Sequence, residues 1–98
     1  MPVTFYREFI RPTTDVAFPE DPAEFVQYVL DTYIATGACT EFRTATYSDD
    51  NLIKTIKSVW TDQTAVDVAL LDPLWYENAV FLSKYSTPLN IIVRNWIE

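Results

Sequence analysis

Histidine is absent from this chain of 98 residues, and glycine and cysteine each occur only once. Without imidazole side chains the chain cannot build histidine-ligated haem, typical zinc sites, or Ser-His and Cys-His nucleophile systems. A single glycine cannot form a glycine-rich phosphate-binding loop. The lone Cys39 excludes an internal disulfide. We expect it to be a small strand residue rather than a nucleophile, because no histidine can activate it.

Basic residues are also scarce: seven Lys and Arg stand against fourteen Asp and Glu, which gives a formal net charge of −7. This balance argues against binding to nucleic acid or to an anionic membrane surface, because both need clustered cations. No stretch reaches the length of a membrane span. Arg7 and Glu8 lie where a signal peptide would be apolar. We therefore expect a cytoplasmic protein with no nucleic-acid and no membrane partner.

Hydrophobic residues, in contrast, make up 49% of the chain, and aromatic residues make up 15%. A chain of this length forms one domain, here residues 1–98, and a domain this small has a thin core. So many apolar side chains indicate an aromatic-rich core, an apolar surface buried against another subunit, or both. No repeat, low-complexity tract or linker divides the chain.

Four segments have the alternation and the β-branched and aromatic content of strands: residues 3–11, 39–47, 52–60 and 90–97. The turn-forming residues 48–51 join the second and third segments into a hairpin.

A first helix is predicted to begin at Asp21, which can cap it, with Pro22 in the first helical position and Glu24 three residues after the cap. Gly37 falls where a left-handed helix stop is expected. Between these signals, six apolar residues recur at spacings of three and four and form one broad stripe: Phe25, Val26, Val29, Leu30, Tyr33 and Ile34.

Asp72 and Pro73 interrupt a second helical run. A residue that precedes proline avoids the helical region, so the run is predicted to end near Leu71. A new helix then begins, with Asp72 as its cap and Pro73 in the first helical position. Thr61 or Asp62 caps the earlier of the two short helices. A single helix kinked at the proline is the alternative.

The order strand, helix, strand, strand, helix, strand predicts an α+β, ferredoxin-like βαββαβ fold. It has a four-stranded antiparallel sheet with the helices on one face, and the second helix is broken at Asp72-Pro73. The other sheet face then has no cover within the chain. Yet the last strand is apolar on both faces, with Val93 on one and Ile92 and Trp96 on the other. A second copy packed sheet against sheet is the simplest cover, so we expect a homodimer.

The pattern VW-x-D…A-x(4)-LLDPLW, residues 59–75, resembles the antibiotic-biosynthesis-monooxygenase group of the dimeric α+β barrel superfamily. In that group a strand ending in Trp leads into a short helix, a small-polar-Pro step and another helix. The resemblance implies a dimer with a small-molecule pocket between the sheet and the helices of each subunit. In some members it implies cofactor-free oxidation of aromatic substrates. Members that degrade haem use a histidine, which this chain lacks.

Aromatic side chains are the first candidates for a ligand site. Trp60 matches the strand-end Trp of the group, where that residue is structural, and filling the core is the simpler role for it. Trp75 and Tyr76 open the helix after the break, so we expect one to pack on the sheet and the other to rim a pocket. Phe81 and Tyr85 share a helical face, either in the core or as a pocket wall.

Arginines within strands are the second candidates. Arg43, preceded by Phe42, and Arg94 each interrupt a β-forming segment, and Arg7 is a third case. A buried guanidinium must be paired. The simpler interpretation is a salt bridge with Glu41, Glu8 or the partner subunit, or a surface position. The functional one is an anchor for the carboxylate or other oxyanion of a ligand at the end of an apolar cleft. The predicted ligand-binding residues are Phe42, Arg43, Trp60, Trp75, Phe81, Tyr85 and Arg94, with no metal, no cofactor and no assigned catalytic residue.

Two hypotheses for the function follow. The first is a homodimeric protein that binds a small hydrophobic or aromatic molecule, one that can carry a carboxylate, with or without a cofactor-independent monooxygenase-like activity. The second is a non-enzymatic acidic interaction protein, such as an inhibitor that caps a basic protein surface. The paired acids Asp49 and Asp50 lie in a predicted hairpin turn, where Asp is favoured by turn chemistry, so they suggest no catalysis. A subunit of a larger assembly is a third possibility that nothing in the chain selects.

Overall fold

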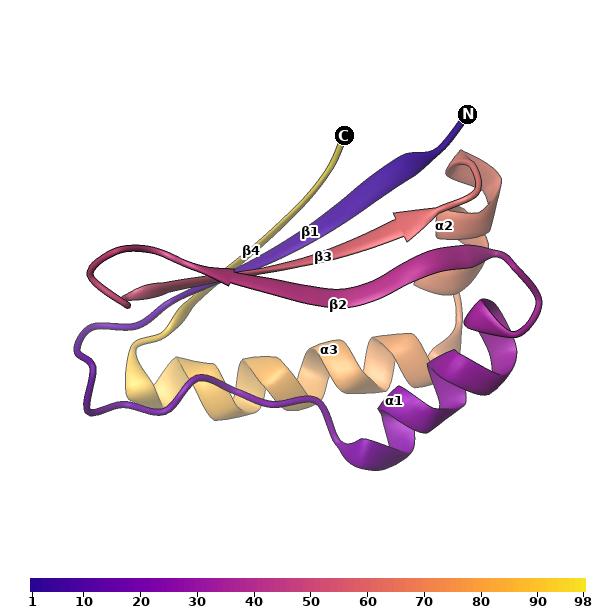
Figure 1. Cartoon of the computed structure of the whole chain (residues 1–98). Coiled ribbons are helices and arrows are strands. Elements are labelled where there is room, and N and C mark those ends of the chain that lie inside the picture. Colours follow the sequence, from indigo (N-terminus) through magenta and orange to yellow (C-terminus); the bar gives the residue numbers. More distant parts are fainter.

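The computed structural model describes residues 1–98 (Figure 1). Along the chain it contains β1 (Val3–Ile10), α1 (Ala23–Val29), the π-helical turn η1 (Leu30–Ile34), β2 (Cys39–Tyr47), β3 (Ile53–Trp60), α2 (Gln63–Leu70), α3 (Pro73–Ser86), the 3-10 turn η2 (Thr87–Leu89) and β4 (Ile92–Ile97). The predicted strands therefore occur in the predicted order, with ends that differ by at most two residues.

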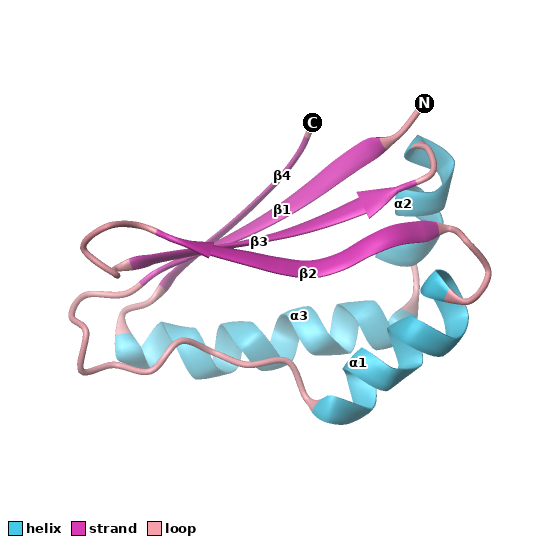
Figure 2. Ribbon diagram, in the orientation of Figure 1, coloured by secondary structure: helices cyan, strands magenta, loops and turns pink.

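The four strands form one antiparallel sheet in the order β2-β3-β1-β4. Helices α1 and α3 lie along one face of this sheet, and α2 lies at its end (Figures 1 and 2). This is the predicted ferredoxin-like βαββαβ arrangement, with the helices on one face. None of the helices has both the length and the apolar character that crossing a bilayer requires.

Aromatic rings make up much of the core between the sheet and the helices. Trp75, on the first turn of α3, is 5% exposed and lies at their centre. Its ring centroid lies between 5.3 and 6.5 Å from five others, mostly edge to face: Phe5, Phe25, Tyr33, Phe42 and Trp60. Edge-to-face pairs of this kind stabilise a core beyond the area that they bury. A second cluster, of Phe9, Leu82 and Ile91, closes the other end of the same layer.

Asp72 explains the proline in the middle of the second helical run. Helix α2 ends at Leu70, and Asp72 has an extended backbone (φ −68°, ψ 125°), so two separate helices form and the single kinked helix is excluded. One carboxylate oxygen of Asp72 accepts a hydrogen bond from the backbone N–H of Leu74 and caps α3. The other accepts from the hydroxyls of Tyr28 at 2.5 Å and Tyr33 at 2.6 Å. The corner between α2 and α3 is thereby fastened to the α1–η1 segment.

The predicted cap at Asp21 is wrong. Helix α1 begins at Ala23, after Pro22, and no side chain caps it. The Asp21 carboxylate instead accepts hydrogen bonds from Arg43 Nε and Asn78 Nδ2, each at 2.9 Å. These bonds to β2 and α3 outweigh the local capping preference, because the Asp21 carboxylate and Asn78 are buried and the charge of Arg43 is paired there. Gly37, in contrast, has the predicted left-handed conformation, with φ 82°.

A β-bulge interrupts β2 where it passes the helices. The pairing between β2 and β3 shifts between Glu41 and Thr44, and Arg43 has φ 64°. Two residues, Phe42 and Arg43, therefore take the place of one and both line the cavity on the helix side of the sheet. A left-handed conformation costs energy for a residue with a side chain, so the surrounding contacts must maintain it.

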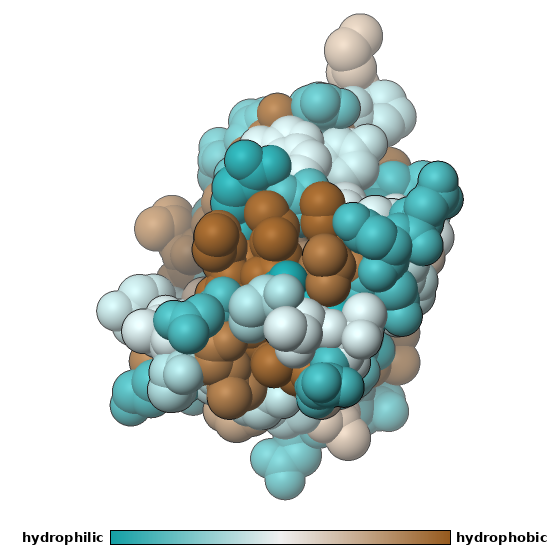
Figure 3. All heavy atoms as spheres, turned by 90° about the vertical axis from the view of Figure 1, so that its left-hand side faces the viewer, coloured by the Kyte–Doolittle hydropathy of each residue, from teal (hydrophilic) through white to brown (hydrophobic).

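The face of the sheet opposite the helices is open in the isolated chain. Tyr6 and Trp96 stack there, with ring centroids 5.2 Å apart. Ile10 pairs across the strands with Ile53 and Ile92, and the side chain of Ile92 is 56% exposed. The end of the molecule that carries the β2–β3 hairpin, at the left of Figure 1, also shows a gathering of apolar side chains (Figure 3). The open face thus has an apolar patch around Ile10 of the kind that the dimer hypothesis requires, and the homodimer itself stays a prediction.

Candidate functional site

A small cavity of about 20 Å³ lies between the sheet and the helices, enough for about one water molecule. Its apolar lining consists of Phe5, Phe25, Phe42, Ile56 and Trp75, and its polar lining of Arg7, Asp21, Arg43 and Ser58. We refer to it as the inner cavity. Its position matches the predicted pocket, but its size does not, because the aromatic rings around Trp75 fill most of the layer.

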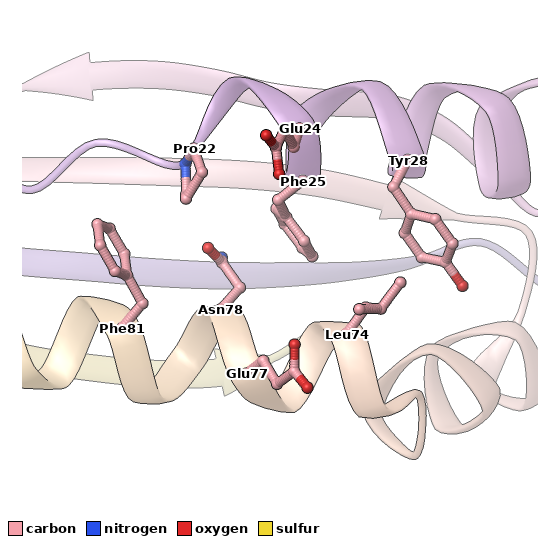
Figure 4. Close-up of a pocket in the computed structure, with 8 residues that line it drawn as sticks. All are labelled: Pro22, Glu24, Phe25, Tyr28, Leu74, Glu77, Asn78 and Phe81. Carbon is pink, nitrogen blue, oxygen red and sulfur yellow. The ribbon is translucent and has the colours of Figure 1, made fainter.

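A larger groove of about 360 Å³ opens on the outer side, between α1 and α3 (Figure 4). Phe25 and Tyr28 from α1 face Leu74, Asn78 and Phe81 from α3 across it. We refer to it as the outer groove; its lining is completed by Pro22, Glu24 and Glu77. Phe25 lines both the outer groove and the inner cavity, so its ring is the wall that separates them.

The interior arginines have different partners. Arg43 donates from Nε to Asp21, whose side chain is 9% exposed, and its Nη2 lies 3.9 Å from Glu20. Arg7 has no acidic side chain within salt-bridge distance, and its Nε donates to Asn95 Oδ1 at 2.8 Å. Burial lowers the pKa of Arg7, and the nearby charge of Asp21 opposes this only in part. Of the two arginines that line the inner cavity, Arg7 is therefore the one without a carboxylate partner.

Asn78 lies at the boundary between the two spaces. It is 5% exposed, and its Nδ2 donates to Asp21 Oδ1. Its Oδ1 is buried and has no hydrogen-bond partner. The amide nitrogen and oxygen of Asn78 can be told apart, because the Asp21 carboxylate can only accept a hydrogen bond and must therefore face Nδ2. An unpaired buried acceptor is costly, so a group that donates to Asn78 Oδ1 would be stabilised here.

Five of the seven predicted ligand-binding residues lie at the inner cavity, at the outer groove or in the core. Phe42, Arg43 and Trp75 meet at the inner cavity, and Phe81, 48% exposed, lines the outer groove. Trp60 is 1% exposed and belongs to the core, as the simpler interpretation of it held.

Two other predicted residues lie away from both spaces. Tyr85 packs beside the second cluster and donates from its hydroxyl to Ala17 O. Arg94 lies on the open face, where it bonds to Glu8 at 2.6 and 2.9 Å. The prediction that Arg94 anchors a ligand under the helices is therefore not supported, since the strand pleat turns its side chain to the other face. The salt bridge with Glu8 that the sequence analysis weighed as the alternative is present.

Four residues of the outer groove were not predicted from the sequence: Phe25, Tyr28, Leu74 and Asn78. Three of them belong to apolar or aromatic helical patterns that also describe a core. Asn78 could have been found from the sequence, because it is an uncharged polar residue three positions after Trp75, on the same side of the helix.

Cys39 is predicted to be chemically inert in the native protein. It is 1% exposed, and burial raises the pKa of its thiol to about 11. Only the thiolate reacts, so iodoacetamide at pH 8 should leave the folded protein unmodified and should label it fully in concentrated denaturant. Intact mass spectrometry measures both states. Rapid labelling of the folded protein would contradict this assignment and would restore Cys39 as a candidate nucleophile.

Comparison with known proteins finds solved structures that have the same fold over nearly the whole chain. No family model matches the chain, and no curated protein sequence does. SnoaB, a cofactor-independent oxygenase from Streptomyces nogalater, aligns over 99% of this chain and 90% of its own, with 23% identity and a TM-score of 0.61. A candidate antibiotic biosynthesis monooxygenase from Deinococcus radiodurans aligns over 98% of this chain and 89% of its own, with 11% identity and a TM-score of 0.57.

The chain shares its fold with these two structures. The resemblance seen in residues 59–75 is thus confirmed at the level of the fold. A dimeric ferredoxin-like protein of unknown function from Jannaschia also aligns, over 95% of this chain and 97% of its own, with 17% identity and a TM-score of 0.50. In this fold, the inner cavity and the outer groove occupy the helix side of the sheet, and the open face is the other side.

Proposed function

We propose that the protein is a homodimer that binds a small hydrophobic or aromatic molecule on the helix side of its sheet. The observation that carries this proposal is the outer groove, whose volume of about 360 Å³ falls in the range of small-molecule sites. The inner cavity, with Arg7 and Arg43, lies behind the ring of Phe25, and rotation of this ring would connect it to the groove. Phe42, Trp75 and Phe81 are the predicted binding residues that line these two spaces.

Binding in the outer groove can be tested with N-phenyl-1-naphthylamine, a neutral probe whose fluorescence rises in apolar surroundings. We expect saturable binding that Leu74→Lys weakens by at least about tenfold, because a charge then replaces an apolar wall. Tyr76→Lys is the matched control: it makes the same charge change on the same helix, at a side chain that is 68% exposed and lines no pocket. Equal binding by all three proteins, or none by the wild type, would contradict the proposed site.

The dimer is proposed to form through the open sheet face. Its charges are already paired, Lys57 with Glu41 and Arg94 with Glu8, so a second copy would meet an apolar face with little unpaired charge. The two copies would pack with their sheets face to face and their strands nearly aligned. The dimeric ferredoxin-like neighbour supports the proposal of a dimer.

Ile92→Asp should convert the dimer to a monomer. The substitution places two carboxylates in a two-fold symmetric interface, since each copy contributes one. Sedimentation equilibrium at micromolar concentration should give twice 11.3 kDa for the wild type and 11.3 kDa for the variant. Leu71→Asp, at an apolar side chain that is 84% exposed on the helix side, should remain dimeric. A monomeric wild type would refute this interface.

Cofactor-free oxidation of a bound aromatic compound is the activity that we propose to test first. SnoaB, which shares the fold, is a cofactor-independent oxygenase. In this chain, the rings around Trp75 make the interior beside the groove largely apolar, which limits the access of water to a compound bound there. An oxygen electrode with polyphenolic substrates would detect the reaction as oxygen uptake that depends on the protein. Uptake equal to that of the Leu74→Lys variant would count against catalysis at this site.

An acidic interaction protein remains the second candidate, favoured by the distribution of charge. Residues 12–38 and 61–91, which form the helical layer, contain nine Asp and Glu and a single Lys, whereas the remainder has five acids and six bases. A basic protein surface would therefore dock on the helices. Stoichiometric capture of one basic protein by a monomeric form, with no probe binding, would favour this function over the first.

A further inference from the structure

The unpaired acceptor of Asn78 indicates which chemical group a ligand of the outer groove would carry. Asn78 points from α3 into the space below Phe25 (Figure 4), and its Oδ1 can only accept a hydrogen bond. No lining residue of the groove is a lysine or an arginine. Tyr28, the one lining hydroxyl, already donates to Asp72. A ligand must therefore bring its own donor to satisfy the acceptor.

The charges of the groove indicate that this donor is cationic. Glu24 stands on the α1 wall and Glu77 on the α3 wall, and neither forms a salt bridge. The helical layer around them is strongly acidic, with Lys84 as its only base. Such a field repels anions and concentrates small cations at the opening. The carboxylate-bearing ligand considered from the sequence does not fit this groove.

The remaining walls favour an aromatic or aliphatic body on that cation. Pro22, Phe25, Tyr28, Leu74 and Phe81 supply apolar surface, and three of these five are aromatic. A positive group over an aromatic face is attracted by the ring, most strongly where water is partly excluded. Aromatic walls, carboxylates on both sides and a buried unpaired acceptor together describe a site for a hydrophobic amine.

We infer that the outer groove binds a lipophilic ammonium compound, whose N–H donates to Asn78 Oδ1 and whose charge is balanced by Glu24 and Glu77. The hydrophobic part lies against Phe25 and Phe81. This inference rests on the proposed small-molecule function and narrows it to a chemical class. It concerns binding only, and it assigns no reaction to the site.

Three ligands of the same shape and different charge test the inference. 2-Naphthylmethylammonium, 2-naphthylmethanol and 2-naphthoate are each used to displace N-phenyl-1-naphthylamine from the purified protein at low ionic strength. We expect the ammonium to displace the probe at about tenfold lower concentration than the alcohol, because a charged donor forms the stronger hydrogen bond. The carboxylate should be the weakest of the three.

Charge-removing variants distinguish the effect of the two groove glutamates from the effect of the protein's net negative charge. Glu24→Gln and Glu77→Gln should each reduce the preference for the ammonium over the alcohol about threefold, and 0.5 M salt should reduce it similarly. Asp31→Asn and Asp67→Asn change the net charge equally, lie outside the groove, and should leave the preference intact. Neither glutamate forms a hydrogen bond or salt bridge within the chain, so the test variants are expected to fold.

The outcomes distinguish the inference from the function on which it depends. Absence of any probe binding would refute the proposed function itself. Probe binding with equal displacement by the three ligands, or with a preference for the carboxylate, would overturn the inference and leave the function standing. An ammonium preference that all four charge variants reduce equally would also overturn it, because the attraction would then come from the net charge and not from the groove.

Discussion

Replacing Asp72 with alanine should lower the free energy of unfolding by about 3 kcal/mol, as measured by urea denaturation. The substitution removes the cap of α3, which contributes about 1 kcal/mol, and leaves the buried Tyr33 hydroxyl without its acceptor, which costs about 1–3 kcal/mol. For a chain of this size, the midpoint of thermal unfolding should fall by roughly 15 °C. Asp67→Ala, which loses only a surface contact with Gln63, should change the stability by less than about 0.5 kcal/mol.

The pH dependence of stability provides an independent check on this cluster. Burial pushes the pKa of Asp72 upward, but the hydrogen bonds from Tyr28, Tyr33 and the Leu74 N–H outweigh it, and the pKa is lowered overall. The resulting stabilisation is present above the unfolded pKa of about 3.9 and is lost as the pH falls through the folded pKa. Asp72→Asn should therefore flatten the acid limb of the stability profile.

Tyr33 should produce the opposite dependence at high pH. Burial, followed by the hydrogen bond to Asp72, raises the pKa of Tyr33 above its ordinary value. The folded protein thus holds its phenolic proton more tightly than the unfolded chain does, and stability falls as the pH rises above about 10. Tyr33→Phe should reduce this alkaline loss. Identical alkaline profiles for the wild type and Tyr33→Phe would show that the cluster is not formed as described.

Trp75→Ala should be the most destabilising single substitution in the core, with a loss of about 4 kcal/mol. The indole contacts five aromatic rings, so truncation leaves a cavity that no neighbour can fill. Trp75→Phe, which keeps one ring, should cost about half as much. Tyr76→Ala, at the adjacent exposed residue, should stay within about 0.5 kcal/mol of the wild type.

A loss below about 1 kcal/mol for Trp75→Ala would contradict the placement of Trp75 at the centre of the core. It would also contradict the assignment of its ring to the wall of the inner cavity. Urea unfolding followed by circular dichroism is suitable, because the signal does not depend on the tryptophan that is replaced.

The parts of the fold that local chemistry determines could be predicted from the sequence. Asp72 before Pro73 has one favourable arrangement, a helix cap followed by a first-turn proline, and the structure has it. Gly37 likewise has the positive φ that its place after the first helix requires. Strand alternation placed Ile92 and Trp96 together on one face, because side-chain direction in a strand follows the pleat, and the structure turns that face away from the helices.

The parts that depend on distant contacts could not be predicted in this way. Asp21 has the sequence signature of a cap, yet it binds Arg43 and Asn78, which are 22 and 57 residues away in the chain. The bulge that turns Phe42 and Arg43 to the same side has no local signal, since Arg43 is an unusual residue for positive φ. The outer groove likewise arises only when α1 and α3 are brought side by side.

The most direct test of the account is a fluorine NMR spectrum of the protein labelled with 5-fluorotryptophan. Its three tryptophans report on three regions: Trp75 on the inner cavity, Trp96 on the open sheet face and Trp60 on the core. We predict that N-phenyl-1-naphthylamine in the outer groove shifts the Trp75 resonance through the ring of Phe25, which lies 5.3 Å from that of Trp75, and shifts the Trp60 resonance less. Dilution through the dimer equilibrium should shift only the Trp96 resonance. A Trp75 resonance unmoved at probe saturation, with Trp96 constant at every concentration, would contradict both the ligand site and the dimer.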